Sequence, residues 1–321
     1  MRGPPICVRC DALRVPDTLR IPVVKTNVGN PTEALRFALY NFPSGARIGR
    51  VFVLQATGLV PSRIWDGFRF WFMARKDPQV AQSGERTNTD GKPVSNIMLL
   101  SISDRDYSSL RPHLEYVSLP NHQVLHEAGG TLEFVYFPNR GLISLVVVMK
   151  DGKTAEAGIV GKEGFTGTLA AVGLSWSPLQ AVVQITGDGF RAEVGALQNT
   201  FESAPHLQLM LSRYAAIQGS QVAQTAACNR LHDIGQRLAR WLLMTQDRVD
   251  SGSLPITHDF LATMLGTDRP TVSLAAGVLQ RKKIIEYTRG AVKIVNRKKL
   301  EDSACECYGV IQRYNGDLGL K

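Results

Sequence analysis

Apolar residues recur at helical spacing near the end of the chain, and they predict two short helices separated by a tight turn. Thr257 is placed to cap the first helix, and the Leu265-Gly-Thr267 sequence ends it. Asp268 can cap the second helix, whose first turn tolerates Pro270 because its N–H groups have no intrahelical partner. The apolar faces comprise Phe260, Leu261 and Met264 in the first helix and Val272, Ala275, Ala276 and Leu279 in the second. Two short helices joined by a Gly-containing turn are typical of a helix-turn-helix motif.

Two β-prone runs follow, Ile284–Tyr287 and Val292–Val295, and residues 288–291 supply a turn between them. This predicted hairpin corresponds to the wing of a winged helix. Basic residues gather around it, namely Arg281, Lys282, Lys283, Arg289 and Lys293. The combination predicts binding to double-stranded DNA, and an ordinary helical subdomain with a solvated basic rim is the alternative.

The middle of the chain consists of short β-prone runs with turn residues between them, which predicts a sandwich or barrel, here a jelly roll. The clearest runs are residues 116–119, 134–137, 142–149, 155–160 and 181–185. Turns are expected at Asn121, Gly129-Gly130, Pro138-Asn139, Asp151-Gly152 and Gly187-Asp188. The predicted fold class is therefore α+β, with a β-roll before the winged helix-turn-helix.

From about Pro205 the chain becomes helical as far as Gln224 or beyond. One face of this predicted helix forms a seam of Leu207, Leu211, Tyr214, Ile217 or Gln218, Gln221 and Thr225. A long helix with one seam between two domains predicts dimerisation, and packing on its own β-domain is the alternative. A further helix is predicted from Leu231 to about Arg248, with Ile234, Leu238, Trp241, Leu242 and Leu243 on its inner side.

Charge is unevenly distributed along the 321 residues, whose net charge is +9. Residues 1–95 carry a net +7, residues 96–225 a net −3 and residues 226–321 a net +5. The basic C-terminal third suits phosphate neutralisation by the predicted DNA-binding motif. An odd count of five cysteines, no signal peptide and no apolar run long enough to cross a bilayer predict a cytoplasmic protein without a membrane partner.

The order of a β-roll, a long helix and a winged helix-turn-helix resembles the Crp/Fnr family of bacterial transcription regulators. The resemblance rests on the 228–244 helix, the Leu265–Ser273 turn and recognition start, the tail around Tyr308, and the segments Val135–Pro138 and Val160–Gly164. It covers about residues 96–314. The family implies a homodimer on a pseudo-palindromic operator in double-stranded DNA, RNA polymerase as a further partner, and no enzymatic activity.

The resemblance implies a sensory β-domain, but not cyclic AMP as its signal. Cyclic-AMP-binding members have a Gly-Glu turn, matched here by Gly161, Glu163 and Gly164, followed by an Arg that pairs with the cyclic phosphate. Leu179 stands at the position of that Arg, and an apolar side chain cannot replace its charge-assisted contact. We therefore expect an unknown small-molecule effector, whose pocket would also include Gln180, Tyr214 and Gln218.

The family's Arg-Glu-x-x-x-Arg readout corresponds here to Arg269, Pro270 and Leu274. Arg269 keeps the chemistry for a bidentate contact to guanine, whereas Pro270 cannot accept from cytosine and Leu274 cannot donate. Thr271 and Ser273 are suited to phosphate or base-edge contacts. The predicted DNA-binding set is completed by Arg281, Lys282 and Arg289, and the usual family operator is not expected.

Two other motifs suggest metal chemistry, but no metal or cofactor is predicted from them. Cys7-x-x-Cys10 with Cys305-x-Cys307 gives four thiols of asymmetric spacing. His122, His126 and Glu127 indicate a rival class, a cupin-like metal-dependent enzyme, which needs a further His on a later strand. The later histidines fall in predicted helices, at His206, His232 and His258. A sensor that binds a protein partner is a third alternative.

Residues 1–95 show no sustained periodicity, and Arg75–Val94 has the composition of a linker. We expect translation to begin near Met98, so that this stretch is an extension rather than a fold, and an extra small domain is the alternative. The predicted domains are then the extension 1–95, the β-roll 96–200, the dimerisation helix 201–228, the winged helix-turn-helix 229–302 and the tail 303–321.

Overall fold

The computed structural model describes residues 23–25, 35–39, 52–56, 81–249, 251–288 and 290–318. The chain divides into two units, residues 1–76 and 77–321. In the first unit β1 (Val23–Lys25), β2 (Leu35–Leu39) and β3 (Phe52–Ala56) form an antiparallel sheet in that order. The sequence predicted no element here, because each strand has five residues or fewer and shows no clear alternation.

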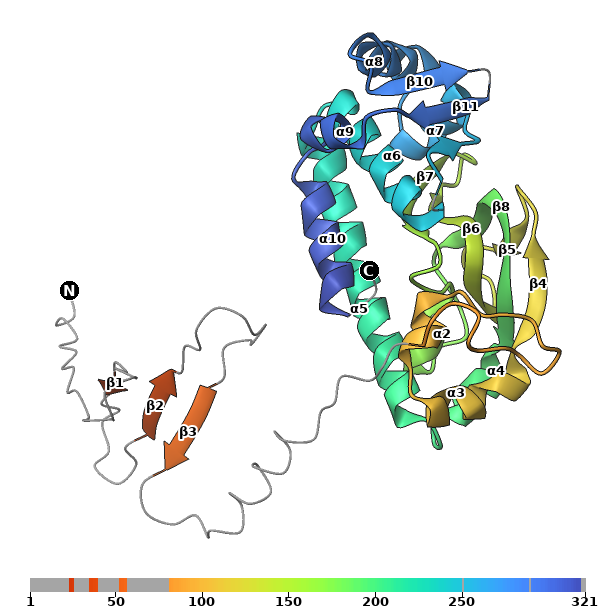
Figure 1. Ribbon diagram of the computed structural model, residues 1–321, viewed down its shortest axis with the longest axis vertical. Helices are drawn as coiled ribbons and strands as arrows, with labels where there is room; N and C mark the ends of the chain where they lie inside the picture. The colour runs from red at the N-terminus through yellow and green to blue at the C-terminus, as the bar shows by residue number, and fades with distance from the viewer. Residues whose placement is uncertain are drawn as a thin grey trace. The chain divides into compact units, whose positions relative to one another are not determined.

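The second unit begins with an antiparallel β-roll, as predicted (Figure 1). Its sheet has the order β4-β8-β6-β7, and β5 also pairs with β8. The strands are β4 (Glu115–Leu119), β5 (Val124–His126), β6 (Phe134–Val148), β7 (Thr154–Val160) and β8 (Gln180–Glu193). Short helices accompany the roll, namely α2 (Ile97–Ser101), α3 (Asp104–Leu110), α4 (Val194–Thr200) and the 3₁₀ turns η1 (Arg111–His113) and η2 (Thr168–Val172).

Strands β6 and β8 are longer than the sequence predicted, and the turns expected at Pro138-Asn139 and Gly187-Asp188 are wrong. Both dipeptides lie inside continuous strands, where the β6–β8 register shifts at bulges. Glycine is required there because a Cβ on Gly187 would overlap the Arg140 carbonyl. These residues therefore mark close backbone approach rather than the end of a strand.

Residues 81–95, which the sequence assigned to the extension, pack against the roll. Val94 is fully buried, and the buried Arg86 donates to the carbonyls of Leu99 and Ile102 at 2.5 and 2.9 Å. The Asn96 side chain caps α2 and donates to the carbonyl of Gly164 at 2.9 Å. A chain starting at Met98 would lack these contacts, so the packed unit begins before the boundary expected from the sequence.

The C-terminal half contains the long linking helix and the winged helix-turn-helix, followed by two short helices. The long α5 (Pro205–Leu231) is followed by α6 (Ile234–Val249), α7 (His258–Leu265) and α8 (Arg269–Arg281). The wing is β10 (Ile285–Thr288) paired with β11 (Ala291–Ile294), which also pairs with β9 (Ser253–Leu254). Two further helices close the fold, α9 (Arg297–Ser303) and α10 (Cys307–Asp317). Within the described residues no helix is long and apolar enough to span a bilayer.

The seam of α5 contacts its own chain. Leu207, Leu211 and Tyr214 are buried in the core of the β-roll. Farther along the same face, Gln221 donates to Asn315 of α10 at 2.9 Å, and α10 lies along α5 (Figure 1). The assignment of this seam to dimerisation is therefore wrong, and the alternative of intramolecular packing is confirmed for it.

Candidate DNA-binding face and the junction behind it

The helix-turn-helix is built by the capping residues that the sequence indicated. The Thr257 hydroxyl accepts from the Phe260 N–H at 3.2 Å, and the Asp268 carboxylate accepts from the Thr271 N–H at 2.7 Å. Gly266 ends α7 with a φ of 59°, a left-handed conformation that favours glycine. The start of each helix and the end of α7 are thus set by defined residues, and these fix the orientation of α8 relative to α7.

Helix α8 presents most of the predicted DNA-binding residues to solvent. Those on its exposed surface and C-cap are Arg269, Pro270, Leu274, Arg281 and Lys282, whereas Thr271 and Ser273 are half-buried. Arg269 lies 3.5 Å from the Asp259 carboxylate, and both side chains are about two-thirds exposed. An ion pair this exposed contributes little, so Arg269 is free to exchange Asp259 for a base or a phosphate. Arg289 lies outside the described residues.

Ser273 forms a hydrogen bond with His258 of α7, within the DNA-binding domain. Its hydroxyl is 2.9 Å from Nδ1 of His258, and the His258 ring stacks on Tyr287 of the wing with centroids 3.9 Å apart. Burial, followed by the positive charge of Arg269, lowers the pKa of His258. A neutral His258 therefore ties α7, α8 and the wing together, and Ser273 serves this contact.

Leu274 forms an apolar pair on the exposed face of α8 with Val278, which the sequence did not single out. Leu274 is 74% exposed, and Val278, one helical turn later, is 40% exposed. In a DNA groove the methyl group of thymine offers an apolar contact to side chains on such a face. The signal available in the sequence was the spacing of four residues between two apolar positions outside the buried face.

Behind this face the DNA-binding domain shares a buried junction with the β-roll. Glu156 of β7 accepts from Nε1 of Trp241 at 2.7 Å and from the Ser144 hydroxyl at 2.6 Å. Burial raises the pKa of Glu156 to about 7, against these two hydrogen bonds and the charges of Arg240 and Arg248, which favour the ionised form. A single apolar cluster continues from the strands into the domain, including Leu142, Ile159 and Ile185 from the roll and Leu242 and Met264 from α6 and α7.

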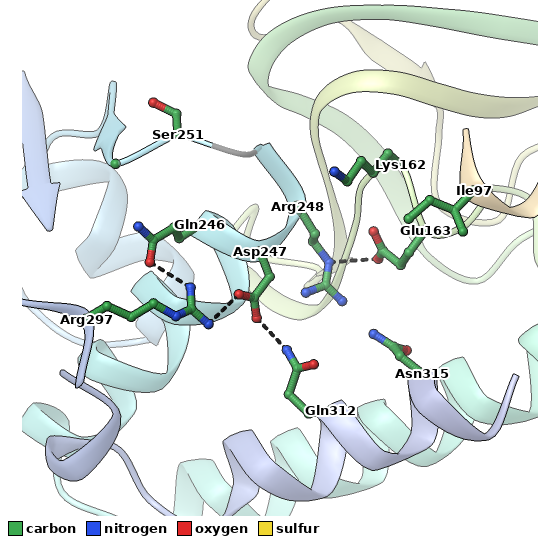
Figure 2. Close-up of a pocket in the computed structure, with 11 residues that line it drawn as sticks. Ile97, Lys162, Glu163, Gln246, Asp247, Arg248, Ser251, Arg297, Gln312 and Asn315 are labelled. Carbon is green, nitrogen blue, oxygen red and sulfur yellow. Dashed lines mark hydrogen bonds and ion pairs between the residues drawn. The ribbon is translucent and has the colours of Figure 1, made fainter. Parts of the chain in front are cut away.

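A second contact across the junction starts from the turn after β7. Oε1 of Glu163 lies 2.8 Å from Nε of Arg248 in α6, and the two buried side chains form an ion pair (Figure 2). The geometry of this pair is not that of a hydrogen bond. Gly164 lies directly against the Tyr214 hydroxyl, where a Cβ would overlap that oxygen. The turn therefore contacts both the linking helix and the DNA-binding domain.

A cavity of 510 Å³ opens beside this turn. Charged side chains of both signs line it, among them Lys162, Glu163, Asp247, Arg248 and Arg297, with Gln312 and Asn315 contributed by α10 (Figure 2). Arg297 pairs with Asp247 at 2.7 Å. The cavity is therefore suited to a small polar or charged molecule.

The structure brings some of the predicted effector residues together and separates others. Gly161, Glu163 and Gly164 form the turn just described, and Tyr214 of α5 contacts it at Gly164. Gln218 accepts from the Thr168 hydroxyl at 3.0 Å, on the same face of α5. The other two lie apart, because Leu179 packs on a different apolar cluster, and Gln180 donates to Glu127 at 2.7 Å.

The structure groups the candidate metal ligands differently from the sequence motifs. Within the described residues one group of three or more ligand side chains lies close together, formed by Cys228, His232, Cys305 and Cys307. It excludes His122, which is exposed, and His126, whose pKa is lowered by burial. Cys7 and Cys10 lie outside the described residues. The contacts of Cys305 with Cys228 and of Cys307 with His232 were missed because each joins positions more than 70 residues apart.

The chain thus combines a β-roll, a long helix and a winged helix-turn-helix whose second helix, α8, has an exposed face. Residues 236–303 match the Crp-like helix-turn-helix domain. The fold is similar to that of the c-di-GMP-responsive global regulator CLP from Xanthomonas campestris, at 14% identity and a TM-score of 0.50 over 59% of this chain and 97% of that one. It is likewise similar to FixK2 from Bradyrhizobium japonicum, at 15% identity and a TM-score of 0.50 over 60% and 98% of the two chains.

A search of curated proteins finds no match. The chain therefore contains a Crp-like helix-turn-helix domain, and it shares its fold with CLP and FixK2. Regulators of the Crp/Fnr family bind DNA and act as dimers.

Proposed function

We propose that the chain is a homodimeric, sequence-specific DNA-binding regulator whose β-roll responds to a small signal other than cyclic AMP. The observation that carries the proposal is the exposed face of α8, where Arg269 precedes the apolar pair Leu274 and Val278. Arg269 would read guanine through a bidentate contact, and Leu274 would meet a thymine methyl group. Lys282, at the base of the wing, would contact phosphate.

Selection of genomic fragments by the purified chain near physiological salt would give the operator, and two variants would then test the assigned roles. Arg269→Ala should lower affinity for the operator by about 1–3 kcal/mol and have little effect on random duplex. Lys282→Ala, the matched control, should weaken binding to both and reduce the salt slope by about one. Equal losses on both duplexes for Arg269→Ala would refute base reading by that residue. No DNA binding at any salt would favour a protein partner instead.

Dimerisation is proposed through the face of α5 opposite its intramolecular seam. The exposed positions Leu209, Arg213, Ala216, Ser220, Ala223 and Ala227 alternate at spacings of four and three residues. That spacing is typical of a helix that pairs along its length. Between residues 214 and 229 α5 contains no charged residue, which is unusual for a solvated face and common at the centre of an interface. Two-fold symmetry would place the half-sites of the operator about one helical turn, roughly 34–36 Å, apart.

Two serine variants test this face. Ser220 and Ser108 are both exposed on helices and both donate to the carbonyl four residues earlier, at 3.1 and 2.7 Å. Ser220→Glu should convert the dimer to a monomer in analytical ultracentrifugation, because it would place two carboxylates in the interface. Ser108→Glu on α3 should leave the dimer intact. A dimer that survives Ser220→Glu would contradict the assignment of this face.

The sensing element is proposed to be the turn containing Gly161, Glu163 and Gly164, together with the neighbouring cavity. Its support is that the turn contacts Tyr214 of α5 and Arg248 of α6, so that a ligand there could bias both. The mixed charges of the cavity favour a small polar effector. Leu179 replaces the phosphate-binding Arg of cyclic-AMP-binding relatives, which argues against cyclic AMP.

A further inference from the structure

Four metal-binding side chains converge where the end of α5 meets the segment between α9 and α10. Cys228 and His232 are one helical turn apart at the C-terminus of α5, and Cys305 and Cys307 flank Glu306 at the start of α10. One potential ligand atom from each of the four residues lies within 4.8 Å of the others. The three cysteines are buried and unpaired by disulfides, and His232 is half-buried.

The separations agree with those of a tetrahedral zinc site. Zinc binds thiolate sulfur at about 2.3 Å and imidazole nitrogen at about 2.0–2.1 Å, so tetrahedral geometry places two sulfurs about 3.8 Å apart and a sulfur and a nitrogen about 3.6 Å apart. Here Sγ of Cys228 lies 3.5 Å from Sγ of Cys305, and Sγ of Cys307 lies 3.6 Å from Nδ1 of His232. Ligation would need only a few tenths of an ångström of adjustment in these pairs.

The surroundings of the four residues support ligation by orienting two of them. Nε2 of His232, the ring nitrogen that would not bind metal, lies 3.3 Å from the Glu306 carboxylate. A carboxylate at that position fixes the ring and its tautomer in many zinc sites. The Gln224 amide donates to Sγ of Cys307 at 3.0 Å, as second contacts to a thiolate do.

We propose that Cys228, His232, Cys305 and Cys307 bind one zinc ion that fastens the C-terminal helices to the end of α5. Four protein ligands leave no position for substrate or water, so the site is structural rather than catalytic. The zinc would fix α10 along α5, where Gln221 already bonds to Asn315. The C-terminal segment would thereby stabilise the helix that joins the sensory and DNA-binding domains. Binding requires that the three thiols lose their protons, which pass to solvent as the metal enters.

Elemental analysis of the full chain, purified without chelator, tests the proposal directly. We expect about one zinc per chain, loss of that zinc in Cys305→Ser/Cys307→Ser, and full retention in the control Cys7→Ser/Cys10→Ser. Glu306→Gln should keep the ligands but weaken zinc affinity about 10–100-fold in competition with a chromogenic chelator. Zinc that disappears in the control and persists in Cys305→Ser/Cys307→Ser would overturn the assignment.

A measurement on the unmodified sequence avoids dependence on how the variants fold. Maleimide labelling followed by peptide mapping should find Cys228, Cys305 and Cys307 protected in the chain as purified and reactive after chelation, with Cys7 and Cys10 unaffected by the chelator. A Cys228–Cys305 disulfide, three thiols equally reactive with and without chelator, or iron and sulfide in place of zinc would each refute the zinc site.

Discussion

Replacing Glu156 by glutamine tests the buried junction between the β-roll and α6. The glutamine carbonyl can accept from Trp241, and its amide can donate to the Ser144 hydroxyl, which rotates to accept. Both hydrogen bonds at 2.6–2.7 Å can therefore be kept while the ionisable group is removed. The variant isolates the free energy of burying this one carboxyl group.

The size and sign of the effect follow from the two pKa values of Glu156. Burial raises its pKa to about 7 in the folded chain, from an ordinary value of 4.5. The folded state thus holds the proton more tightly, so this stabilisation is fully present below about pH 4.5 and is lost as the pH rises through about 7. The difference corresponds to about 3 kcal/mol in total, of which about 2 to 3 kcal/mol falls between pH 5 and pH 8.

Urea denaturation followed by circular dichroism would measure the free energy of unfolding at both pH values. The wild type should lose about 2 to 3 kcal/mol more than Glu156→Gln between pH 5 and pH 8. Glu202→Gln, an exposed substitution on the same domain, should follow the wild type. Parallel pH profiles for the wild type and Glu156→Gln would refute the reasoning, because they would mean that Glu156 titrates alike in the folded and unfolded chains.

Three further predictions concern the turn after β7 and the face of α8. Gly164→Ala should destabilise by about 1–3 kcal/mol in a thermal melt, since its methyl group must displace the buried Tyr214, and an unchanged Tm would contradict this contact. Glu163→Gln should lower the free energy of unfolding by about 3–5 kcal/mol, because it leaves Arg248 charged and buried without its partner. Adding Arg248→Met should recover most of that loss, whereas additive losses in the double variant would argue against the pair. Replacing the contacted thymine by deoxyuridine should weaken operator binding by about 0.8 kcal/mol, roughly fourfold, and Leu274→Ala should abolish that difference in a fluorescence titration.

Local rules were sufficient to predict the helix-turn-helix. Thr257 and Asp268 cap their helices, and Gly266 ends α7, because capping and left-handed turns depend on residues within one turn of the helix. The same holds for β10 and β11, which are joined by a short turn. Exposure of Arg269 also follows from the helical period once the buried face is assigned.

Features that depend on distant partners could not be predicted. The glycines of β8 indicated a turn, but they serve the close approach of β6 from more than 40 residues away. The seam of α5 has the same residues whether it faces a second copy or its own chain, and its contacts with η2, β7 and α10 show that it faces its own chain. Glu156 gives no local sign of burial, since its partner Trp241 is 85 residues away. The cysteine and histidine cluster is likewise created by the return of the C-terminal segment to α5.

The apolar cluster that continues from Leu142 and Ile159 into α6 and α7 has a thermodynamic consequence for switching. Any rotation of the DNA-binding domain away from the strands must bring part of this shared core into contact with water. Exposed apolar surface raises the heat capacity, and buried apolar surface lowers it. An effector that frees the domain should therefore bind with a positive heat-capacity contribution from the junction, whereas one that tightens the junction should contribute a negative one. Calorimetric titrations at several temperatures would distinguish the two directions of control.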